Sequence, residues 1–248
     1  MNKNSLVRKS TRVRIKPKIW DATFILTYSN IKTFRKLLNL IKNKGKIKIL
    51  DLGCGYKPFE ILFKDFGFEY EYIGVDFDKE NASPDIIIDL NYEKLPFENE
   101  TFDVVILSEV LEHIYNTKNV INEALRVLKK DGFIYISTPF VFPEHGIPYD
   151  YFRFTEFFYI KLAEHYNLKV VFINKSGSYL SVPLVSINLF LEGLLRKFKL
   201  SVMSYPLFFF TNLIALISDI IVSKLTFAEI HKKLKRLYIG ISIIYKKI

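Results

Sequence analysis

The sequence predicts an α/β fold built on a doubly wound, mostly parallel sheet of seven strands. From residue 46 onward, short runs rich in β-branched residues alternate with segments whose apolar residues recur at helical spacing. This alternation is typical of βαβ units. A glycine turn, DLGCG at 51–55, follows the first run directly. Because glycine lets backbone amides approach a bound group closely, the turn indicates a ligand-binding edge of the sheet.

The order of elements follows from these runs. The strands are expected at residues 47–52, 71–76, 85–89, 103–108, 133–138, 168–174 and 238–245. A helix at 30–43 is expected to pack before the first strand. Another is expected at 119–129, where apolar residues recur every three or four positions, and KKDG at 129–132 is expected to end it.

The C-terminal part is more apolar than the rest. Two long apolar stretches, 178–195 and 203–222, are separated by RKFK and followed by HKKLKR. The predicted organisation is a basic tail at 1–20, a core at 21–175, an apolar helical insertion at 176–235 and the last core strand at 236–248.

Three interpretations of the insertion stay open. It could be an apolar hairpin lying in a membrane interface, a buried or dimerising helical subdomain, or a pair of spanning helices. Pro206, Asn212 and Asp219 interrupt the second apolar stretch and speak against a span.

Charge is unevenly distributed along the chain. The net charge is +10, with +7 in residues 1–20, +6 in residues 224–248 and −3 between them. Basic termini of this kind could bind nucleic acid or the anionic headgroups of a membrane, or they could simply be solvated tails. One cysteine excludes an internal disulfide and fits a reducing compartment, and no apolar run of signal-peptide length follows the basic start. We therefore expect a cytoplasmic protein, at the inner face of the membrane if the insertion binds lipid.

Acids stand at the ends of three predicted strands. Asp76 suits ribose hydroxyls, and Asp89 suits an exocyclic amine. Asp51 is wrong for a pyrophosphate site because a carboxylate repels phosphate, and Pro58 replaces the third glycine of a dinucleotide fingerprint. A cationic ligand fits better. S-adenosylmethionine, with its ammonium, sulfonium and adenosine, has the required chemistry.

Four segments carry a family resemblance. ILDLGCG, YIGVD, LPFENETFDVVILSEVLEHI and EALRVLKKDGFIYISTP resemble successive motifs of class I S-adenosylmethionine-dependent methyltransferases. Within that superfamily they are most similar to the ubiquinone-type and surface-glycan-cluster enzymes. The resemblance covers about residues 46–155. It implies a Rossmann-like methyltransferase fold, S-adenosylmethionine as cofactor, and an antiparallel seventh strand that the run at 238–245 supplies.

The resemblance also implies a cofactor-binding set: Asp51, Gly53, Cys54, Gly55, Asp76, Phe77, Asp89, Leu90 and Ser108. By this analogy the two glycines lie against the methionine moiety, which Asp51 helps to organise. Asp76 takes the ribose, Phe77 packs on adenine, and Ser108 lies near the sulfonium. Cys54 is expected to be only a small residue in a tight turn.

SEVLEHI places Glu109, Glu112 and His113 at i, i+3 and i+4, which predicts one face at the start of a helix. Acids there would also favour the helix dipole, with Ser108 as N-cap. In the resembling small-RNA 2′-O-methyltransferases, a Glu-x-x-Glu-His of this spacing holds a divalent metal with a later histidine. The matching position here is Asp150, with His145 nearby, so metal binding stays open.

The loop at 139–155 is the second candidate for chemistry. Tyr149, Asp150 and Arg153 are expected to contact the acceptor with Glu109 and Glu112, although an Asp150–Arg153 pair could simply hold the loop. His113 or His145 is the expected general base.

The predicted function is transfer of a methyl group to an oxygen of a glycan, a lipid-linked intermediate or a small metabolite. Peripheral membrane contact through 176–235 would suit a lipid-linked acceptor. The rivals are a nicotinamide oxidoreductase, a nucleic-acid ribose methyltransferase and a catalytically inactive cofactor-binding partner subunit. A nucleic-acid partner is not favoured, because the middle of the chain is slightly acidic. The acceptor and the oligomeric state stay open.

Overall fold

The computed structural model describes residues 11–80, 82–198, 200, 204–224 and 235–248. It divides into two compact units. The sheet unit comprises Lys32–Pro139, Pro143–Asn174 and Ser242–Ile248, and the hairpin unit comprises Met1–Ile31, Phe140–Phe142 and Lys175–Ile241. Residues 1–10 of the predicted basic tail, and residues 231–234 of the HKKLKR segment, lie outside the described residues.

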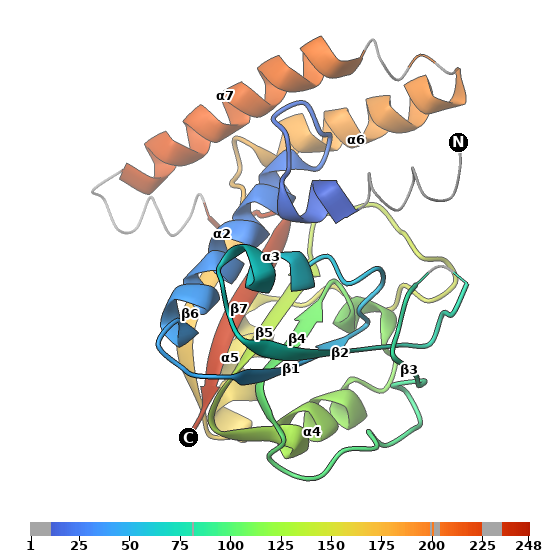
Figure 1. Cartoon of the computed structure of the whole chain (residues 1–248). Helices are drawn as coiled ribbons and strands as arrows, with labels where there is room; N and C mark the ends of the chain where they lie inside the picture. The colour runs from blue at the N-terminus through green and yellow to red at the C-terminus, as the bar shows by residue number, and fades with distance from the viewer. Residues whose placement is uncertain (1–10, 81, 199, 201–203, 225–234) are drawn as a thin grey trace. The chain divides into compact units, whose positions relative to one another are not determined.

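Seven strands form one sheet in the order β3-β2-β1-β4-β5-β7-β6 (Figure 1). Their bounds are β1 Ile47–Leu52, β2 Tyr70–Asp76, β3 Ile86–Ile87, β4 Phe102–Ser108, β5 Leu128–Pro139, β6 Leu168–Ser176 and β7 Gly240–Lys247. The pairs β1–β2, β1–β4, β2–β3 and β4–β5 are parallel. The predicted α/β, mostly parallel, doubly wound sheet is therefore confirmed. Because parallel strands end at one edge, the segments after β1, β2 and β4 meet there.

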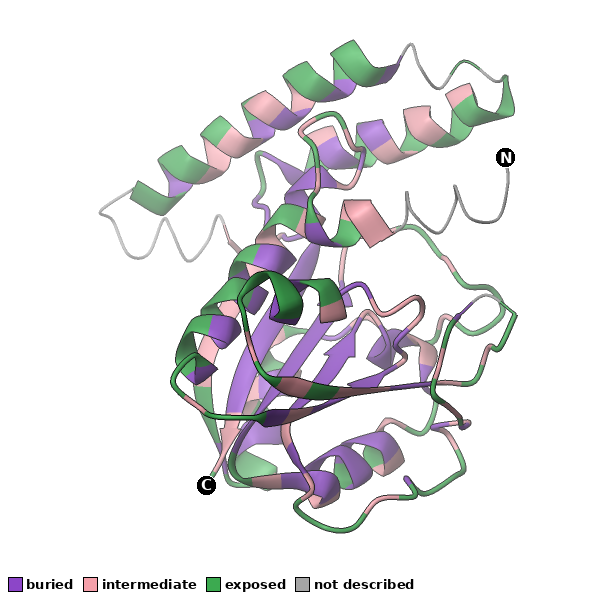
Figure 2. Ribbon diagram, in the orientation of Figure 1, coloured by how far each residue is buried: buried purple, intermediate pink, exposed green. Residues whose placement is uncertain are grey.

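The helices are α2 Phe24–Ile41, α3 Glu60–Asp65, a 3-10 turn at Leu111–His113, α4 Thr117–Val127, α5 Glu156–His165, α6 Val182–Lys197 and α7 Ser204–Lys224. The core of the sheet unit is strongly apolar, and Figure 2 shows the central strands buried along their length. Phe34, Phe63 and Tyr135 are fully buried, and Phe34 lies edge-on to both other rings. Such aromatic pairs favour one packing arrangement over alternatives.

Two sequence-based boundaries are wrong. α4 ends at Val127, and KKDG belongs to the beginning of β5 instead of ending the helix. The β4–β5 register shifts between Phe102, opposite Leu128, and Val104, opposite Phe133, so the extra residues form an irregularity. The third strand is also shorter than expected, which leaves Asp89 two residues beyond its end.

In the hairpin unit, α6 and α7 pack against each other. Val185 of α6 and Ala215 of α7 belong to a small buried apolar cluster that also includes Phe24. α7 is long and apolar enough to cross a membrane, and only 22% of its most apolar window is buried inside the protein. The polar residues that interrupt it face inward. Asn212 donates to the carbonyls of Ile19 and Asp21, at 2.7 and 2.9 Å.

Candidate functional site

The glycine turn after β1 has the backbone that only glycine adopts easily. Gly53 and Gly55 have φ angles of 69° and 51°, in the left-handed region. A Cβ on Gly53 would lie 2.4 Å from the Val110 side chain, so Gly53 permits a close approach within the protein. A Cβ on Gly55 would meet no atom within 4 Å. The open space therefore lies on the Gly55 side, where a ligand can contact bare backbone.

Two of the predicted acids surround this turn. Asp76 Oδ2 accepts a hydrogen bond from the Gly55 amide at 2.9 Å, and its Oδ1 accepts one from the Asp78 amide at 3.1 Å. Asp51 is buried and accepts a hydrogen bond from the Tyr72 hydroxyl. Burial and the neighbouring Asp51 carboxylate raise the pKa of Tyr72, which keeps this hydroxyl a donor. The negative charge and the open Gly55 backbone fit a cationic nucleoside better than a phosphate.

Cys54 has a packing role in the turn. Its side chain is buried, and a Cβ on Gly74 would lie 2.8 Å from the Cys54 sulfur. Burial, then the charges of Asp51 and Asp76, raise the pKa of the Cys54 thiol. The thiol therefore stays protonated and unreactive at neutral pH.

An ion pair near the turn escaped the sequence analysis. Lys57 Nζ contacts Asp85 Oδ1 at 2.5 Å, and Asp85 Oδ2 accepts a hydrogen bond from the Gly74 amide at 2.7 Å. These contacts outweigh desolvation and lower the pKa of Asp85. The pair stabilises the segment after β2. The sequence offered only a lysine and an acid 28 positions apart, with no spacing signal.

The other predicted cofactor residues are distributed around the same edge. Phe77 follows β2, is 59% exposed, and lies edge-on to Tyr149 with ring centroids 6.0 Å apart. Asp89 accepts hydrogen bonds from the Asn91 amide and side chain, at 2.9 and 3.0 Å, so it organises a turn. Leu90 beside it is buried. Their contacts with a cofactor stay predictions.

The predicted helix start at SEVLEHI is wrong. Ser108 ends β4, and its hydroxyl lies 3.0 Å from the Ser137 hydroxyl, so it caps no helix. Glu109 has a φ of 57°, a conformation that helices exclude. Only a 3-10 turn follows, and α4 begins at Thr117. Glu109 therefore does not share a helical face with Glu112 and His113.

The structure instead brings Glu112 and His113 together with His145. Each imidazole has its Nε2 3.7 Å from Glu112 Oε1. Glu112 has no exposed side-chain surface, whereas the two histidine side chains are 24% and 32% exposed. The Glu112 carboxylate raises the pKa of His145 above its usual value.

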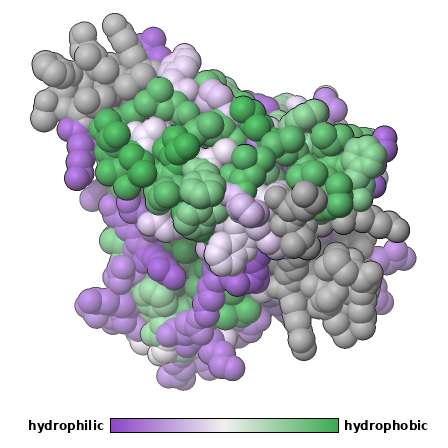
Figure 3. Space-filling model, turned by 90° about the horizontal axis from the view of Figure 1, so that it is seen from above, coloured by the Kyte–Doolittle hydropathy of each residue, from purple (hydrophilic) through white to green (hydrophobic). Residues whose placement is uncertain are grey.

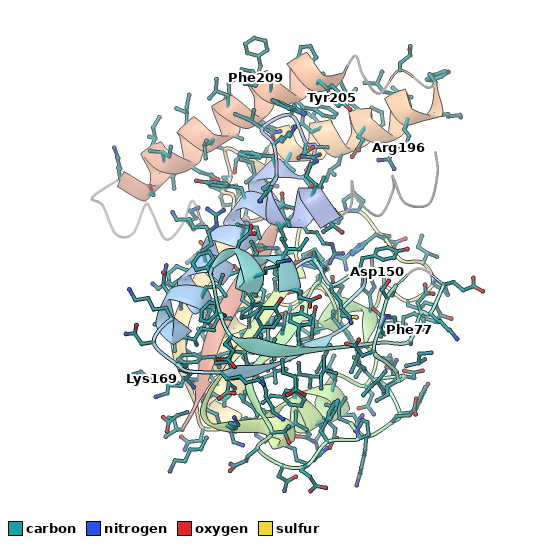
Figure 4. The ribbon with its side chains drawn as sticks, viewed as in Figure 1. Phe77, Asp150, Lys169, Arg196, Tyr205 and Phe209 are labelled. Carbon is teal, nitrogen blue, oxygen red and sulfur yellow. The ribbon has the colours of Figure 1, made fainter. Side chains whose placement is uncertain are left out.

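Asp150 does not take the metal-matching position that the motif spacing suggested. Arg153 binds both its carboxylate oxygens, at 2.6 and 2.8 Å, so the expected loop-holding pair is confirmed. Arg153, then the backbone amide of His145, lowers the pKa of Asp150. Asp150 and Phe77 lie on loops at the same end of the sheet unit (Figure 4). Tyr149 between them is half exposed, as expected of an acceptor contact, but its role stays a prediction.

A glycine turn, an acid at the end of the second strand and a doubly wound seven-stranded sheet define the class of S-adenosylmethionine-dependent methyltransferases. A family model described as a methyltransferase domain matches residues 27–171. The chain belongs to this methyltransferase family, and S-adenosylmethionine is its cofactor.

Individual relatives differ in their acceptors. The chain is 30% identical over 124 residues to a sarcosine/dimethylglycine N-methyltransferase of Aphanothece halophytica, covering 45% of each chain. It is 31% identical over 104 residues to a ubiquinone biosynthesis O-methyltransferase of Photobacterium profundum, covering 37% of this chain and 43% of the relative. The matches thus span less than half of these relatives' lengths.

Solved structures agree on the fold. A methyltransferase from Mesorhizobium loti, described as S-adenosylmethionine-dependent, superposes with a TM-score of 0.53 at 14% identity. The match covers 88% of this chain and 98% of that one. At this identity the likeness supports the fold alone.

Proposed function

We propose that this protein methylates a hydroxyl oxygen of a lipid-linked acceptor at an anionic membrane surface. S-adenosylmethionine supplies the methyl group and departs as its neutral thioether. The chain's own residues would bind and orient: Asp76 the ribose, and the Gly53–Gly55 turn the methionine part. A hydroxyl loses one proton for each methyl group it gains, and the Glu112, His113 and His145 cluster is the group suited to receive it.

The membrane part of this proposal rests on one observation, the apolar outer face of α7. Five side chains at helical spacing are exposed there: Leu207, Phe210, Ile214, Ile217 and Ile221. We call them the α7 stripe. Figure 3 looks onto the hairpin, where hydrophobic residues form a broad area. Such large exposed apolar areas mark interaction surfaces.

The polar residues of α7 are already satisfied within the hairpin unit. Asp219 accepts hydrogen bonds from the hydroxyls of Ser178 and Ser181, at 2.6 and 2.9 Å. The Asn188 amide donates to Asn212 Oδ1 at 3.2 Å. One face of α7 is therefore held by polar contacts and the other is apolar. This pattern suits a helix that lies in the membrane interface better than a transmembrane helix, because a transmembrane helix faces lipid over more of its circumference.

Charge supports a lipid partner over a second protein copy. The hairpin unit contains sixteen basic and four acidic residues, a net charge of +12, whereas the sheet unit has twenty basic and twenty-two acidic residues. Arg196, labelled in Figure 4, and Lys197 end α6, and Lys224 ends α7. Two copies would repel each other through such surfaces, whereas anionic headgroups attract them.

Vesicle sedimentation tests the proposal. The full chain should pellet with vesicles containing phosphatidylglycerol and much less with pure phosphatidylcholine. Phe210→Ser with Ile217→Ser should abolish pelleting, while Phe157→Ser, at a still more exposed position on α5, should not. Two results would contradict peripheral membrane binding. One is a dimer in solution that the double substitution dissociates, and the other is that only detergent extracts the protein from membranes. Methyl transfer from labelled cofactor into a membrane lipid extract, absent in Asp76→Ala, would identify the acceptor class.

A further inference from the structure

The Glu112 carboxylate is in an unusual position for an acid. It is fully buried, and neither oxygen accepts a hydrogen bond from the part of the chain that the structure describes. An ionised carboxylate buried in this way costs several kcal/mol unless a cation accompanies it. The groups in contact with it are the two imidazoles of His113 and His145, and the charge of Arg153 also acts on it.

The hydrogen bonds of the two histidines fix which nitrogen faces Glu112. His113 Nδ1 lies 2.7 Å from the Tyr149 carbonyl, which can only accept, so Nδ1 carries the hydrogen. His145 Nδ1 lies 3.2 Å from the Pro143 carbonyl and 3.4 Å from Asp150 Oδ2, again acceptors only. In both neutral rings, Nε2 therefore presents a lone pair toward the carboxylate. Lone pairs directed at a carboxylate repel it, so the arrangement needs a positive charge, supplied either by a proton on one ring or by a cation held between the three side chains.

We propose that Glu112, His113 and His145 bind a divalent first-row transition metal ion. One ligand atom from each residue lies within 4.8 Å of the other two. Tetrahedral ligands at about 2.1 Å from an ion lie about 3.4 Å apart, close to the 3.7 Å between each Nε2 and Glu112 Oε1. Two imidazoles and one carboxylate suit zinc(II) or cobalt(II), whereas magnesium and calcium prefer oxygen ligands throughout.

The surroundings resemble those of established metal sites. Ligating histidines usually donate their second nitrogen to a carbonyl or carboxylate, which orients the ring, and both rings here do so. Arg153 holds Asp150 behind His145, and a Cβ on Gly146 would lie 3.0 Å from the His113 ring. Gly146 therefore lets that ring lie against the loop backbone. The partly exposed imidazoles leave a path for the ion.

Three protein ligands leave a position for an oxygen from outside the protein. The Tyr149–Phe77 contact places this cluster beside the predicted adenine end of the cofactor site. An acceptor hydroxyl bound to the ion would lose its proton to solvent water more readily, and the histidines would then act as ligands instead of as the base. This use rests on the proposed function, whereas metal binding does not.

Metal titration of the purified full chain tests the site. After treatment with a chelator, the chain should take up one equivalent of zinc(II) in competition with a chromophoric chelator. Cobalt(II) should give the visible absorption of a low-coordinate site. Glu112→Gln and His145→Ala should each weaken binding more than tenfold, since the first removes the charge of a ligand and the second removes a ligand outright. His165→Ala, an exposed histidine on α5, should bind as the wild type does.

X-ray absorption on the zinc-loaded wild type tests the ligands without relying on the folding of a variant. Two imidazoles with oxygen and no sulfur are expected. The proposal fails if neither ion binds the wild type, if the double variant His113→Ala, His145→Ala binds equally well, or if sulfur is a ligand. Calorimetry with S-adenosylmethionine on the metal-free chain tests the cofactor site independently of the metal site. If the chain binds S-adenosylmethionine but takes up neither ion, the metal site alone is refuted.

Discussion

The Asp76 carboxylate accepts a hydrogen bond from the Gly55 amide, with Oδ2 and the nitrogen 2.9 Å apart. The acid at the end of β2 is thereby tied to the turn after β1. Asp76 is only half buried, so its oxygens keep acceptor capacity for a ligand. One side chain therefore shapes the turn and is available to bind ribose.

Asp76→Ala should weaken S-adenosylmethionine binding by more than tenfold in calorimetry. The substitution removes a charged acceptor whose hydrogen bonds are each worth about 1.5–3 kcal/mol. Asp76→Asn keeps one acceptor oxygen for the Gly55 amide and should lose less affinity. Glu164→Ala, on the exposed face of α5, serves as the control. Equal affinity of Asp76→Ala and the wild type would remove Asp76 from the cofactor site.

The two glycines of the turn should respond differently to alanine. Gly53→Ala adds left-handed strain and an overlap with Val110, so it should lower the free energy of unfolding by about 2–5 kcal/mol. Gly55→Ala meets open space and should cost only about 1–2 kcal/mol, while its methyl group obstructs the cofactor. Urea unfolding measures the first effect and calorimetry the second.

Val110→Ala should recover part of the stability lost in Gly53→Ala, because it removes the methyl groups that overlap. If the double variant loses more free energy of unfolding than the two single variants lose together, the overlap with Val110 is not what destabilises Gly53→Ala.

Cys54 should resist alkylation in the native protein. Burial raises the pKa of its thiol, and the thiolate is the reactive form. Iodoacetamide at mildly alkaline pH should therefore modify the folded chain slowly and the urea-unfolded chain completely. Since the chain has one cysteine, mass spectrometry reads this site alone. Rapid stoichiometric modification of the folded protein would show that the turn opens or that the thiol is activated.

Glu123→Gln should destabilise the fold in a pH-dependent way. Glu123 binds Arg126 through both oxygens, at 2.9 and 2.8 Å, and accepts the Leu95 amide at 2.9 Å. The Arg126 contact is the main cause that lowers the pKa of Glu123. A lowered pKa contributes stability above the unfolded pKa of about 4.3, and this stability is lost as the pH falls through the folded value.

The free energy of unfolding of the wild type should therefore exceed that of Glu123→Gln by about 1–3 kcal/mol at neutral pH. This difference should shrink as the pH falls into the acid range. Urea midpoints across this pH range measure it. Arg126→Gln should show the same trend, because it removes the other half of the pair. A difference that stays constant into acid would mean that the charge of Glu123 is not what stabilises the fold.

Local patterns determined most of the fold and the turn. The runs that form β1, β2 and β4, and the bend at Gly53–Gly55, follow from side-chain burial and backbone freedom over a few adjacent residues. The boundary at KKDG could not be predicted in this way, because pairing with β4 draws those residues into β5 against their local tendency to end a helix.

By itself, the sequence determined that a doubly wound sheet carries acids and a glycine turn along one edge, because each signal is local and parallel strands end together. Only the tertiary structure decided that Glu112 and His113 meet His145 rather than Asp150, and that the apolar residues of α7 divide into a packed face and an exposed one. These outcomes depend on which loops and helices meet in space. That choice is made by burial and hydrogen bonding between segments far apart in the chain, and no spacing along the sequence records it.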